Sequence, residues 1–424
     1  MKSVLDLRVE RPVVGGVMLA HHRGRVVLVS GAIPGERVRA GVVRESRDVI
    51  HATVVDVVDP DPDRRTINVD PACGGQVYLH INYDRQLQLK SEIILDALRR
   101  IARAGNLGRV TVAPSPEHGY RMRGRLHVGP SGLGFLREGT HQLCNTADTG
   151  QLLSETNYTL AMVGRWLAGS NYRSVLHIDF AEDIAAETRV INFHLKNLSL
   201  SKAVSDWASG SSLSGVTWSR PGSSAIEVVA GEPNIVDSVS TLLPESPSLE
   251  GTIGRNVRSF FQANRYLLPS LVSAVCNYVK VGPVLDLYAG VGLFAVTLAS
   301  LGVDEITAVE RDIMARKDLT QNAKGSPRQI QVVGTSVERF LAGSSQRIPG
   351  TVIVDPPRAG LSKTVLERLV QRQAASIVYV SCDVATFARD VGRFRKAGYA
   401  IERIQAFDMF PNSAHIELLA KIES

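Results

Sequence analysis

The sequence predicts an α/β protein that ends in a doubly wound, mainly parallel sheet. Three observations lead to this prediction. From residue 251 onward, short apolar strands alternate with helical segments, which is typical of a parallel sheet covered by helices. Before residue 60, short β-branched stretches alternate with glycine and proline turns, which is typical of a small barrel. The pattern between these regions is mixed and predicts an α+β domain.

The first predicted domain, residues 1–59, is a small β-barrel. Its turns are marked by Gly15-Gly16, Gly31 and Pro34-Gly35. It is rich in arginine, whose planar fork suits phosphate recognition; these residues are Arg8, Arg11, Arg23, Arg25, Arg37, Arg39, Arg44 and Arg47. We favour a barrel that contacts RNA over the alternative, a solvated face on a structural barrel.

The second predicted domain spans residues 60–250 and has an α+β pattern. A stiff Asp/Pro linker at 59–63 precedes it. Residues 83–104 are apolar at helical spacing and predict an amphipathic helix. Strand-like pieces such as 190–195 alternate with Gly/Ser-rich turns, which favours an antiparallel sheet of undetermined strand order.

Composition narrows the class of protein. The 424 residues carry a net charge of +6, with 44% hydrophobic and 21% charged residues, as in ordinary globular proteins that admit a polyanionic partner. Four scattered cysteines exclude a disulfide framework and favour a reducing cytoplasm. The sequence shows neither a signal peptide nor an apolar stretch of about 20 residues. We expect a cytoplasmic monomer that does not bind membranes.

The third predicted domain spans residues 251–424. The predicted strands are 284–287, 305–310, 329–333, 351–355 and 377–380, and the helices between them include 292–301, 312–323 and 361–373. Ligands of such sheets bind outside the carboxyl ends of the strands. The residues that directly follow these strands are therefore the candidate functional residues.

A glycine-containing turn follows the first of these strands, in the segment VLDLYAGVGLFAVTLAS. Gly290 and Gly292 allow a ligand to approach the backbone, and the next helix offers free N–H groups. Glu310 ends the following strand about 20 residues later, where an acidic residue holds a ribose diol. This pattern favours a nucleoside cofactor over the alternative, a purely structural turn.

Asp355 ends another strand and is followed by Pro356-Pro357, which stiffen the loop. Such a loop can hold a substrate or cofactor edge, although the prolines can also merely terminate the strand. Arg358 stands where amino-group methyltransferases carry a base-stacking aromatic residue. This argues against an enzyme acting on adenine N6.

Cys382 and Glu417 lie at two further strand ends. A thiolate adds to electron-poor ring carbons and leaves easily, so Cys382 is a candidate nucleophile, with a redox or inert cysteine as the alternative. Glu417 begins an apolar strand, where desolvation would suit it for a general base; an exposed edge-strand glutamate is the alternative.

The segment TIGRNVRSFFQANRYLL, residues 252–268, precedes the sheet. Gln262 and Asn264 could reach a cofactor, while Arg255, Arg258 and Arg265 could meet phosphate. The alternative is a surface helix with solvated arginines.

The stretches FFQAN, DLYAGVGLF, VDPPRAGL, YVSCDVATFARD and FPNSAHIE, with GAIPGERV at 31–38, resemble the RNA 5-methyluridine methyltransferases that carry an N-terminal TRAM domain. The resemblance implies an OB-like TRAM barrel, an α+β middle domain and a Rossmann-like class I methyltransferase domain. It implies S-adenosyl-L-methionine as cofactor and tRNA or 23S-type rRNA as partner. By resemblance, Cys382 is the nucleophile, Glu417 is the base, and the cofactor-binding residues are Gln262, Tyr288, Gly290, Glu310 and Asp355.

The sequence departs from the family pattern in two places. The usual Ser-Cys-Asn-Pro reads Ser381-Cys382-Asp383-Val384, so the loop loses its proline. Several members carry a four-iron cluster on four cysteines, but the region near 67–76 is degenerate. Its cysteines correspond here to Ile67, Cys73 and Gln76, and Cys144 matches the fourth. We predict no iron–sulfur cluster and no other metal, with Cys73 and Cys144 as relics or core residues.

The resemblance also predicts a reaction. The Cys382 thiolate would add to C6 of a uracil, C5 would take the methyl group, and Glu417 would remove the C5 proton. Two alternatives stay open: a methyltransferase acting on another RNA atom without a covalent adduct, and a non-catalytic RNA-binding homologue.

Overall fold

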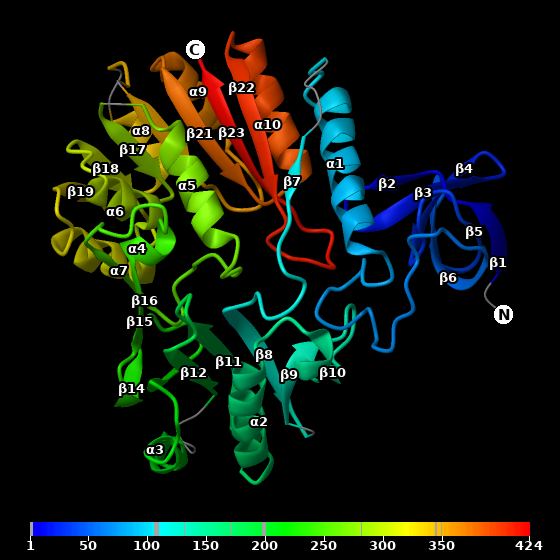
Figure 1. Cartoon of the computed structure of the whole chain (residues 1–424), viewed down its shortest axis with the longest axis horizontal. Coiled ribbons are helices and arrows are strands. Elements are labelled where there is room, and N and C mark those ends of the chain that lie inside the picture. The colour runs from blue at the N-terminus through cyan, green and yellow to red at the C-terminus, as the bar shows by residue number, and fades with distance from the viewer. Residues whose placement is uncertain are drawn as a thin grey trace.

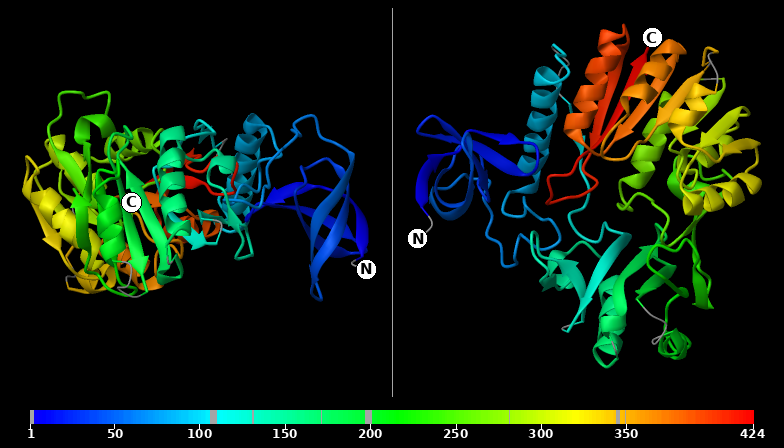
Figure 2. Two further views of the ribbon diagram at one scale, coloured as in Figure 1. Left: turned by 90° about the horizontal axis from the view of Figure 1, so that it is seen from below. Right: turned by 180° about the vertical axis from the view of Figure 1, so that it is seen from behind.

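The protein folds around three main sheets (Figure 1). This computed structural model describes residues 3–105, 110–130, 132–170, 172–196, 201–280, 282–343, 346–348 and 350–424. The N-terminal sheet projects to one side, the middle sheet lies below and the C-terminal sheet forms the largest body, as the views from below and behind also show (Figure 2). No helix among the described residues is both long and apolar enough to cross a bilayer.

Six strands form the N-terminal sheet, in the order β1-β5-β6-β4-β3-β2. They are β1 (Val4–Arg8), β2 (Arg11–Val13), β3 (Val17–His22), β4 (Arg25–Ser30), β5 (Arg37–Glu45) and β6 (Val49–Asp59). The sheet curls around an apolar core that includes Leu7, Val27 and Val38, because alternate strand residues point inward. Two of its arginines form ion pairs at the surface: Arg37 pairs with Asp6, and Arg39 pairs with Asp56.

The middle sheet has seven strands in the order β10-β9-β8-β11-β12-β13-β14, and its pairs are antiparallel except for β12 and β13. They are β8 (Arg123–Gly129), β9 (Gly132–Leu136), β10 (Leu143–Cys144), β11 (Val175–Glu182), β12 (Arg189–Leu195), β13 (Gly215–Ser219) and β14 (Glu227–Gly231). Helices α2 (Ser154–Ala168) and α3 (Ser201–Ala208) share the apolar core of one face. The other face carries polar side chains.

Cys73 and Cys144 form a disulfide, which corrects the expectation of two unlinked relic or core residues. The bond fixes the loop after β6 to strand β10. Gln76 is buried and its amide donates to the carbonyl of Thr149 at 2.7 Å, while Gln151 donates to the carbonyl of Gly74 at 3.0 Å. Cys73 and Cys144 are therefore bonded to each other, and Gln76 stands where the family has its second cysteine. This region does not offer the four thiolates that a four-iron cluster needs.

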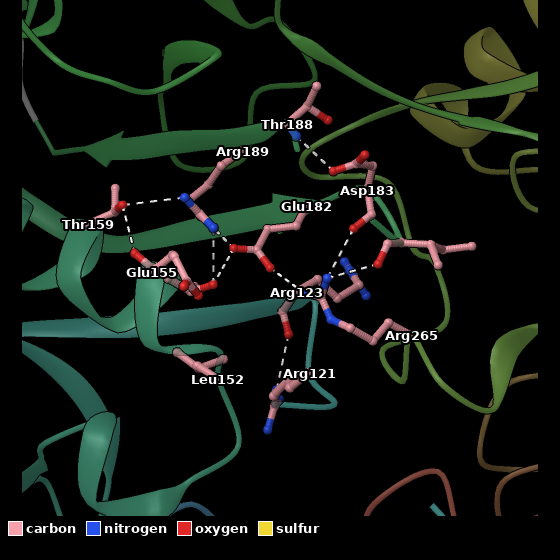
Figure 3. Close-up of polar contacts among 12 residues, drawn as sticks. Arg121, Arg123, Leu152, Glu155, Thr159, Glu182, Asp183, Thr188, Arg189 and Arg265 are labelled. Atoms are coloured by element: carbon pink, nitrogen blue, oxygen red, sulfur yellow. Dashed lines mark hydrogen bonds and ion pairs between the residues drawn. The ribbon is translucent and has the colours of Figure 1, made fainter. Parts of the chain in front are cut away.

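A strap of two antiparallel strands, β15 (Asn234–Ser238) and β16 (Thr252–Asn256), connects the middle and C-terminal sheets; the short helix α4 (Val239–Leu242) lies between them. Residues 252–268 are therefore not a surface helix, and two of their three arginines are engaged in ion pairs. Arg255 is buried and pairs with Asp237, and Arg265 is buried and pairs with Glu182 of β11. Glu182 also bonds Arg189, so one carboxylate ties β11 and β12 to the segment that follows the strap (Figure 3).

The C-terminal sheet has eight strands in the order β19-β18-β17-β20-β21-β23-β22-β7. They are β7 (Val112–Ala113), β17 (Val284–Leu287), β18 (Ile306–Val309), β19 (Ile330–Val333), β20 (Thr351–Val354), β21 (Ser376–Ser381), β22 (Ala400–Phe407) and β23 (Glu417–Glu423). Strands β17 to β21 are parallel, while β23 runs antiparallel to both of its neighbours. The predicted doubly wound sheet is confirmed.

Helices cover both faces of this sheet. One face packs against α1 (Tyr83–Arg100), α8 (Val337–Ala342), α9 (Lys363–Gln371) and α10 (Val384–Lys396), and the other against α4, α5 (Leu268–Tyr278), α6 (Leu293–Ser300) and α7 (Ile313–Lys324). Helix α1 and strand β7 thus come from residues 60–250 but pack with the C-terminal sheet (Figure 1). A buried ion pair between Lys90 of α1 and Asp408 (2.5 Å) strengthens this attachment.

Candidate active site

The candidate site lies at the carboxyl edge of the C-terminal sheet, where the strand order reverses between β17 and β20. Leu287 is level with Val309 on one side and with Val354 on the other. The residues just beyond these positions, Tyr288, Glu310 and Asp355, therefore meet at one edge of the sheet. The parallel register brings these predicted residues together.

The turn after β17 has the backbone of a ligand-binding loop. Tyr288 (φ 63°), Gly290 (φ 58°) and Gly292 (φ 92°) all have positive φ, which is unfavourable for tyrosine. A Cβ on Gly292 would lie 2.6 Å from Leu319, whereas one on Gly290 would meet nothing within 4 Å. Gly292 is therefore required by packing, and Gly290 leaves open space beside the strand end.

Glu310 holds this turn closed. Its carboxylate accepts from the backbone N–H of Gly290 at 2.9 Å and from that of Asp312 at 2.6 Å. Each carboxylate oxygen retains a lone pair for a further donor. The side chain thus fixes the turn and can still accept hydrogen bonds from a diol.

Asp286 is a candidate that the sequence analysis placed in the motif but did not assign to the site. Its side chain is 1% exposed; one oxygen accepts from the N–H of Ala295 at 3.1 Å, and the other has no partner among the described residues. Burial, Asp355 and Glu310 raise the pKa of its carboxyl to about 8. An orphaned, buried carboxyl oxygen suits a cationic or N–H-bearing part of a ligand.

The loop after β20 is pinned by helix α10. Asp390 of that helix accepts from the N–H of Leu361 at 2.8 Å and from the hydroxyl of Tyr379 at 3.0 Å. Asp355 lies at the start of this loop, and burial raises the pKa of its carboxyl to about 7. The loop is stiffened by Pro356-Pro357 at one end and anchored at the other, which places Asp355 firmly.

Cys382 and Glu417 are brought face to face by the antiparallel pairing of β21 and β23. Ser381 pairs with Leu418, so Cys382 and Glu417 occupy the next opposed position. Glu417 is 4% exposed and Cys382 is partly buried. The expectation of a buried Glu417 is confirmed, and the alternative of an exposed edge-strand glutamate is wrong, because β22 covers the other edge of β23.

Burial and neighbouring charges shift the pKa of both Cys382 and Glu417. Burial, then Glu417 and Asp355, raise the pKa of the Cys382 thiol to about 11, and Arg358 opposes this shift. Burial and Asp355 likewise raise the pKa of Glu417 well above its ordinary value, again opposed by Arg358. The sequence did not reveal which cation acts on the thiol; the structure identifies Arg358 on the Pro-Pro loop.

The loop after Cys382, which lacks the family's proline, is held by a helix N-cap. Asp383 is the N-cap of α10, and its side chain accepts from the N–H of Thr386 at 2.8 Å. Asp383 thus fixes the start of α10 directly after Cys382.

In the segment before α5, Gln262 and Asn264 differ in what their side chains contact. Gln262 is buried, and its predicted contact with the cofactor stays a prediction. Asn264 instead supports the backbone: its amide donates to Ser115 and to the carbonyl of Met409, and its oxygen accepts two N–H groups at the start of α5. The expectation that Asn264 could reach a cofactor is therefore wrong.

The two phenylalanines of this segment also differ. Phe261 is buried and packs beneath Arg255, whose guanidinium lies 3.8 Å from the ring centroid. Phe260 is 64% exposed, and Arg123 lies 5.4 Å from its centroid. Phe260 thus presents an exposed aromatic ring two residues before Gln262.

Comparison with known proteins agrees with this arrangement. A family model described as tRNA (Uracil-5-)-methyltransferase matches residues 314–422, which include Asp355, Cys382 and Glu417. An uncharacterized RNA methyltransferase of Aquifex aeolicus is 28% identical and covers 99% of this chain and 98% of its own. The 23S rRNA (uracil(1939)-C(5))-methyltransferase of Halomonas elongata is also 28% identical, over 94% of this chain and 85% of its own.

A solved structure is similar over nearly the whole molecule. The tRNA (uracil-54, C5)-methyltransferase of Pyrococcus abyssi, in complex with S-adenosyl-L-homocysteine, is 26% identical with a TM-score of 0.75, covering 98% of this chain and 99% of that one. The predicted class I methyltransferase fold is confirmed. The strand order, the residues at the strand ends and these matches all agree with the resemblance of this chain to the RNA 5-methyluridine methyltransferases.

Proposed function

We propose that this protein transfers a methyl group from S-adenosyl-L-methionine to C5 of a uridine in tRNA or rRNA, through a covalent bond between Cys382 and C6. The observation that carries the proposal is the opposed pair Cys382 and Glu417, at the sheet edge that also holds the glycine turn. A nucleophile and a base are thereby presented to the same small volume.

The residues at the strand ends fit the cofactor. Glu310 would accept from the ribose diol, the open space beside Gly290 would admit the nucleoside, and the orphaned oxygen of Asp286 would face its cationic part. Tyr288, Gln262 and Asp355 complete this set. When bound, S-adenosyl-L-methionine supplies an electrophilic methyl group.

The protein's own residues then move electrons and protons at the uracil. The Cys382 sulfur bonds to C6, and the electron pair of the C5–C6 bond makes C5 nucleophilic. After C5 has gained the methyl group, Glu417 takes the C5 proton, the double bond reforms and the C6–sulfur bond breaks to return the thiolate. A raised pKa strengthens Glu417 as a base, and Arg358 favours the thiolate form of Cys382.

We also propose a division of labour along the chain. Residues 1–59 would act as a TRAM-like barrel and residues 60–250 as an RNA-contacting middle domain, while residues 251–424 would carry catalysis in a monomer. The target uridine must leave its stack to reach the site, at a cost of a few kcal/mol that a loop or single strand reduces.

The proposal is tested with unmodified tRNA and rRNA, labelled S-adenosyl-L-methionine and nucleoside mass spectrometry. We expect the label in 5-methyluridine. Label in any other nucleoside, or in none with either RNA, would contradict it.

A further inference from the structure

On the open face of the middle sheet, away from α2 and α3, two histidines and a carboxylate converge. His177 of β11 pairs directly with His194 of β12, and Asp179 lies two residues along β11, so all three share one face. One potential ligand atom from each residue lies within 4.8 Å of the other two. The two imidazole rings lie 3.9 Å apart between centroids with a 32° tilt.

The hydrogen bonding of this cluster is incomplete. His194 and Asp179 are buried and contact each other at 2.7 Å. His177 has no such contact: its buried Nε2 has no partner among the described residues. A buried imidazole nitrogen without a partner is costly unless a ligand that is absent here completes its bonding.

The surroundings provide the supporting contacts that metal ligands require. Nδ1 of His194 lies 3.2 Å from the Ser219 hydroxyl, which accepts from Asn192 at 3.0 Å, so Nε2 of His194 can face a metal. Arg125 donates to Oδ1 of Asp179 at 2.9 Å and, at the longer distance of 3.5 Å, to Oδ2, whose shorter contact is with Nε2 of His194 at 2.7 Å. His177 is only partly buried, so a fourth position is open to water.

We propose that His177, Asp179 and His194 bind one zinc ion, which the sequence analysis did not predict. Two imidazoles and one carboxylate with an open fourth position form a donor set that suits zinc, whereas magnesium and calcium prefer oxygen ligands. Zinc bonds of about 2.0–2.2 Å place tetrahedral donors roughly 3.4 Å apart. The His194–Asp179 contact, at 2.7 Å, must widen by about 0.7 Å, and the ligand atom of His177, which lies within 4.8 Å of the other two, must approach by at most about 1.4 Å.

The site lies away from the strand ends of the C-terminal sheet, on two strands of the middle domain, so its role is to join β11 to β12 rather than to take part in methyl transfer. Metal binding that requires the folded pair of strands stabilises that fold by mass action.

The test uses the full-length protein with any affinity tag removed. After dialysis against zinc in a weakly chelating buffer, metal content is measured by mass spectrometry, and cobalt(II) absorption gives a second readout. We expect one zinc per chain and a thermal midpoint that falls on chelation. His177→Ala and His194→Gln should each weaken binding by at least about 10-fold, the loss caused by disturbing even an outer hydrogen bond of a metal site.

His127→Ala is the matched control, because His127 pairs with His177 from the other side, on β8, but is not part of the triad. It should keep its zinc. If His194→Gln fails to fold, His177→Ala still decides, since the free nitrogen of His177 makes no bond to lose. Zinc content that is equal in wild type and His177→Ala, or no zinc in wild type, would overturn the proposal.

Discussion

At the scale of single residues, the site is governed by how carboxylates and one guanidinium act on a thiol. Glu417 and Asp355 both raise the pKa of Cys382, while Arg358 lowers it. The sequence placed Cys382, Asp355 and Glu417 at strand ends, and Arg358 on the loop after Pro356-Pro357, but could not indicate their mutual distances. Register, a long-range property, decides that Cys382 and Glu417 face each other.

The first prediction concerns pH. Because the pKa of the Cys382 thiol is raised to about 11, the thiolate is a minor form at pH 7 and its fraction grows as pH rises. We expect kcat/KM of the free enzyme to rise about tenfold per unit between pH 7 and 9. Arg358→Ala should lower the whole profile, because it removes the cation that favours the thiolate. A flat profile in wild type would contradict this role of the thiol.

The second prediction concerns Asp286, whose pKa is raised to about 8. The folded protein keeps a proton that the unfolded chain releases near pH 4, so this contribution to stability is complete below pH 4 and is lost as pH rises through 8. Asp286→Asn mimics the protonated form at every pH. We expect its free energy of unfolding, relative to wild type, to increase by about 1.4 kcal/mol per pH unit between pH 4 and 8 and to level off above pH 8.

Above pH 8, where the wild-type carboxylate is ionised, the same variant should bind S-adenosyl-L-homocysteine about tenfold more weakly, since it lacks the charge proposed to face the ligand. Calorimetric titration measures this affinity. Unchanged affinity together with unchanged stability would remove Asp286 from the site.

At the scale of elements, the helices and strands of the C-terminal domain follow from the sequence because each has a clear period and clear ends. Residues 292–301, 312–323 and 361–373 correspond closely to α6, α7 and α9. In the segment 252–268, Arg255 and Arg265 were expected to meet phosphate, or alternatively to lie on a surface helix, but both are buried in ion pairs. Its partners, Asp237 and Glu182, are distant enough in sequence that no local pattern reveals them.

The third prediction concerns the N-terminus of α10. Asp383→Ala removes the cap on Thr386, and we expect a loss of about 1 kcal/mol in the free energy of unfolding. The loop that carries Cys382 should also loosen, so methylation should slow. Asp383→Asn keeps a capping oxygen and serves as the control. Denaturant unfolding measures both, and equal stability of the alanine and asparagine variants would argue against the cap.

At the scale of the whole molecule, buried contacts join segments of the chain that the sequence analysis assigned to separate domains. Helix α1 and strand β7 attach to the C-terminal sheet through a core and the Lys90–Asp408 pair, which composition along the chain cannot show. Likewise the Cys73–Cys144 disulfide joins residues 71 positions apart, so it depends on the tertiary fold. The residue pattern along the chain, in contrast, was enough to predict three regions that differ in their secondary structure.

The fourth prediction concerns the Glu182 network (Figure 3). Arg265→Ala leaves part of a buried carboxylate without its cation, which costs about 3–5 kcal/mol. Because the strap leads directly to Gln262, activity should fall as well. Lys202→Ala breaks the exposed pair with Asp206 and should change stability by less than about 0.5 kcal/mol. Comparable losses in the two variants would contradict the structural role of the network.

The most direct test of the account is to trap the covalent bond. Glu417→Gln is incubated with substrate RNA and S-adenosyl-L-methionine and run on a denaturing gel. Because addition and methyl transfer need only Cys382, while release needs the base, we predict a stable protein–RNA adduct that disappears when Cys382→Ala is added to the same chain. Normal 5-methyluridine formation by the Cys382→Ala variant, or an adduct that persists without that sulfur, would contradict the mechanism.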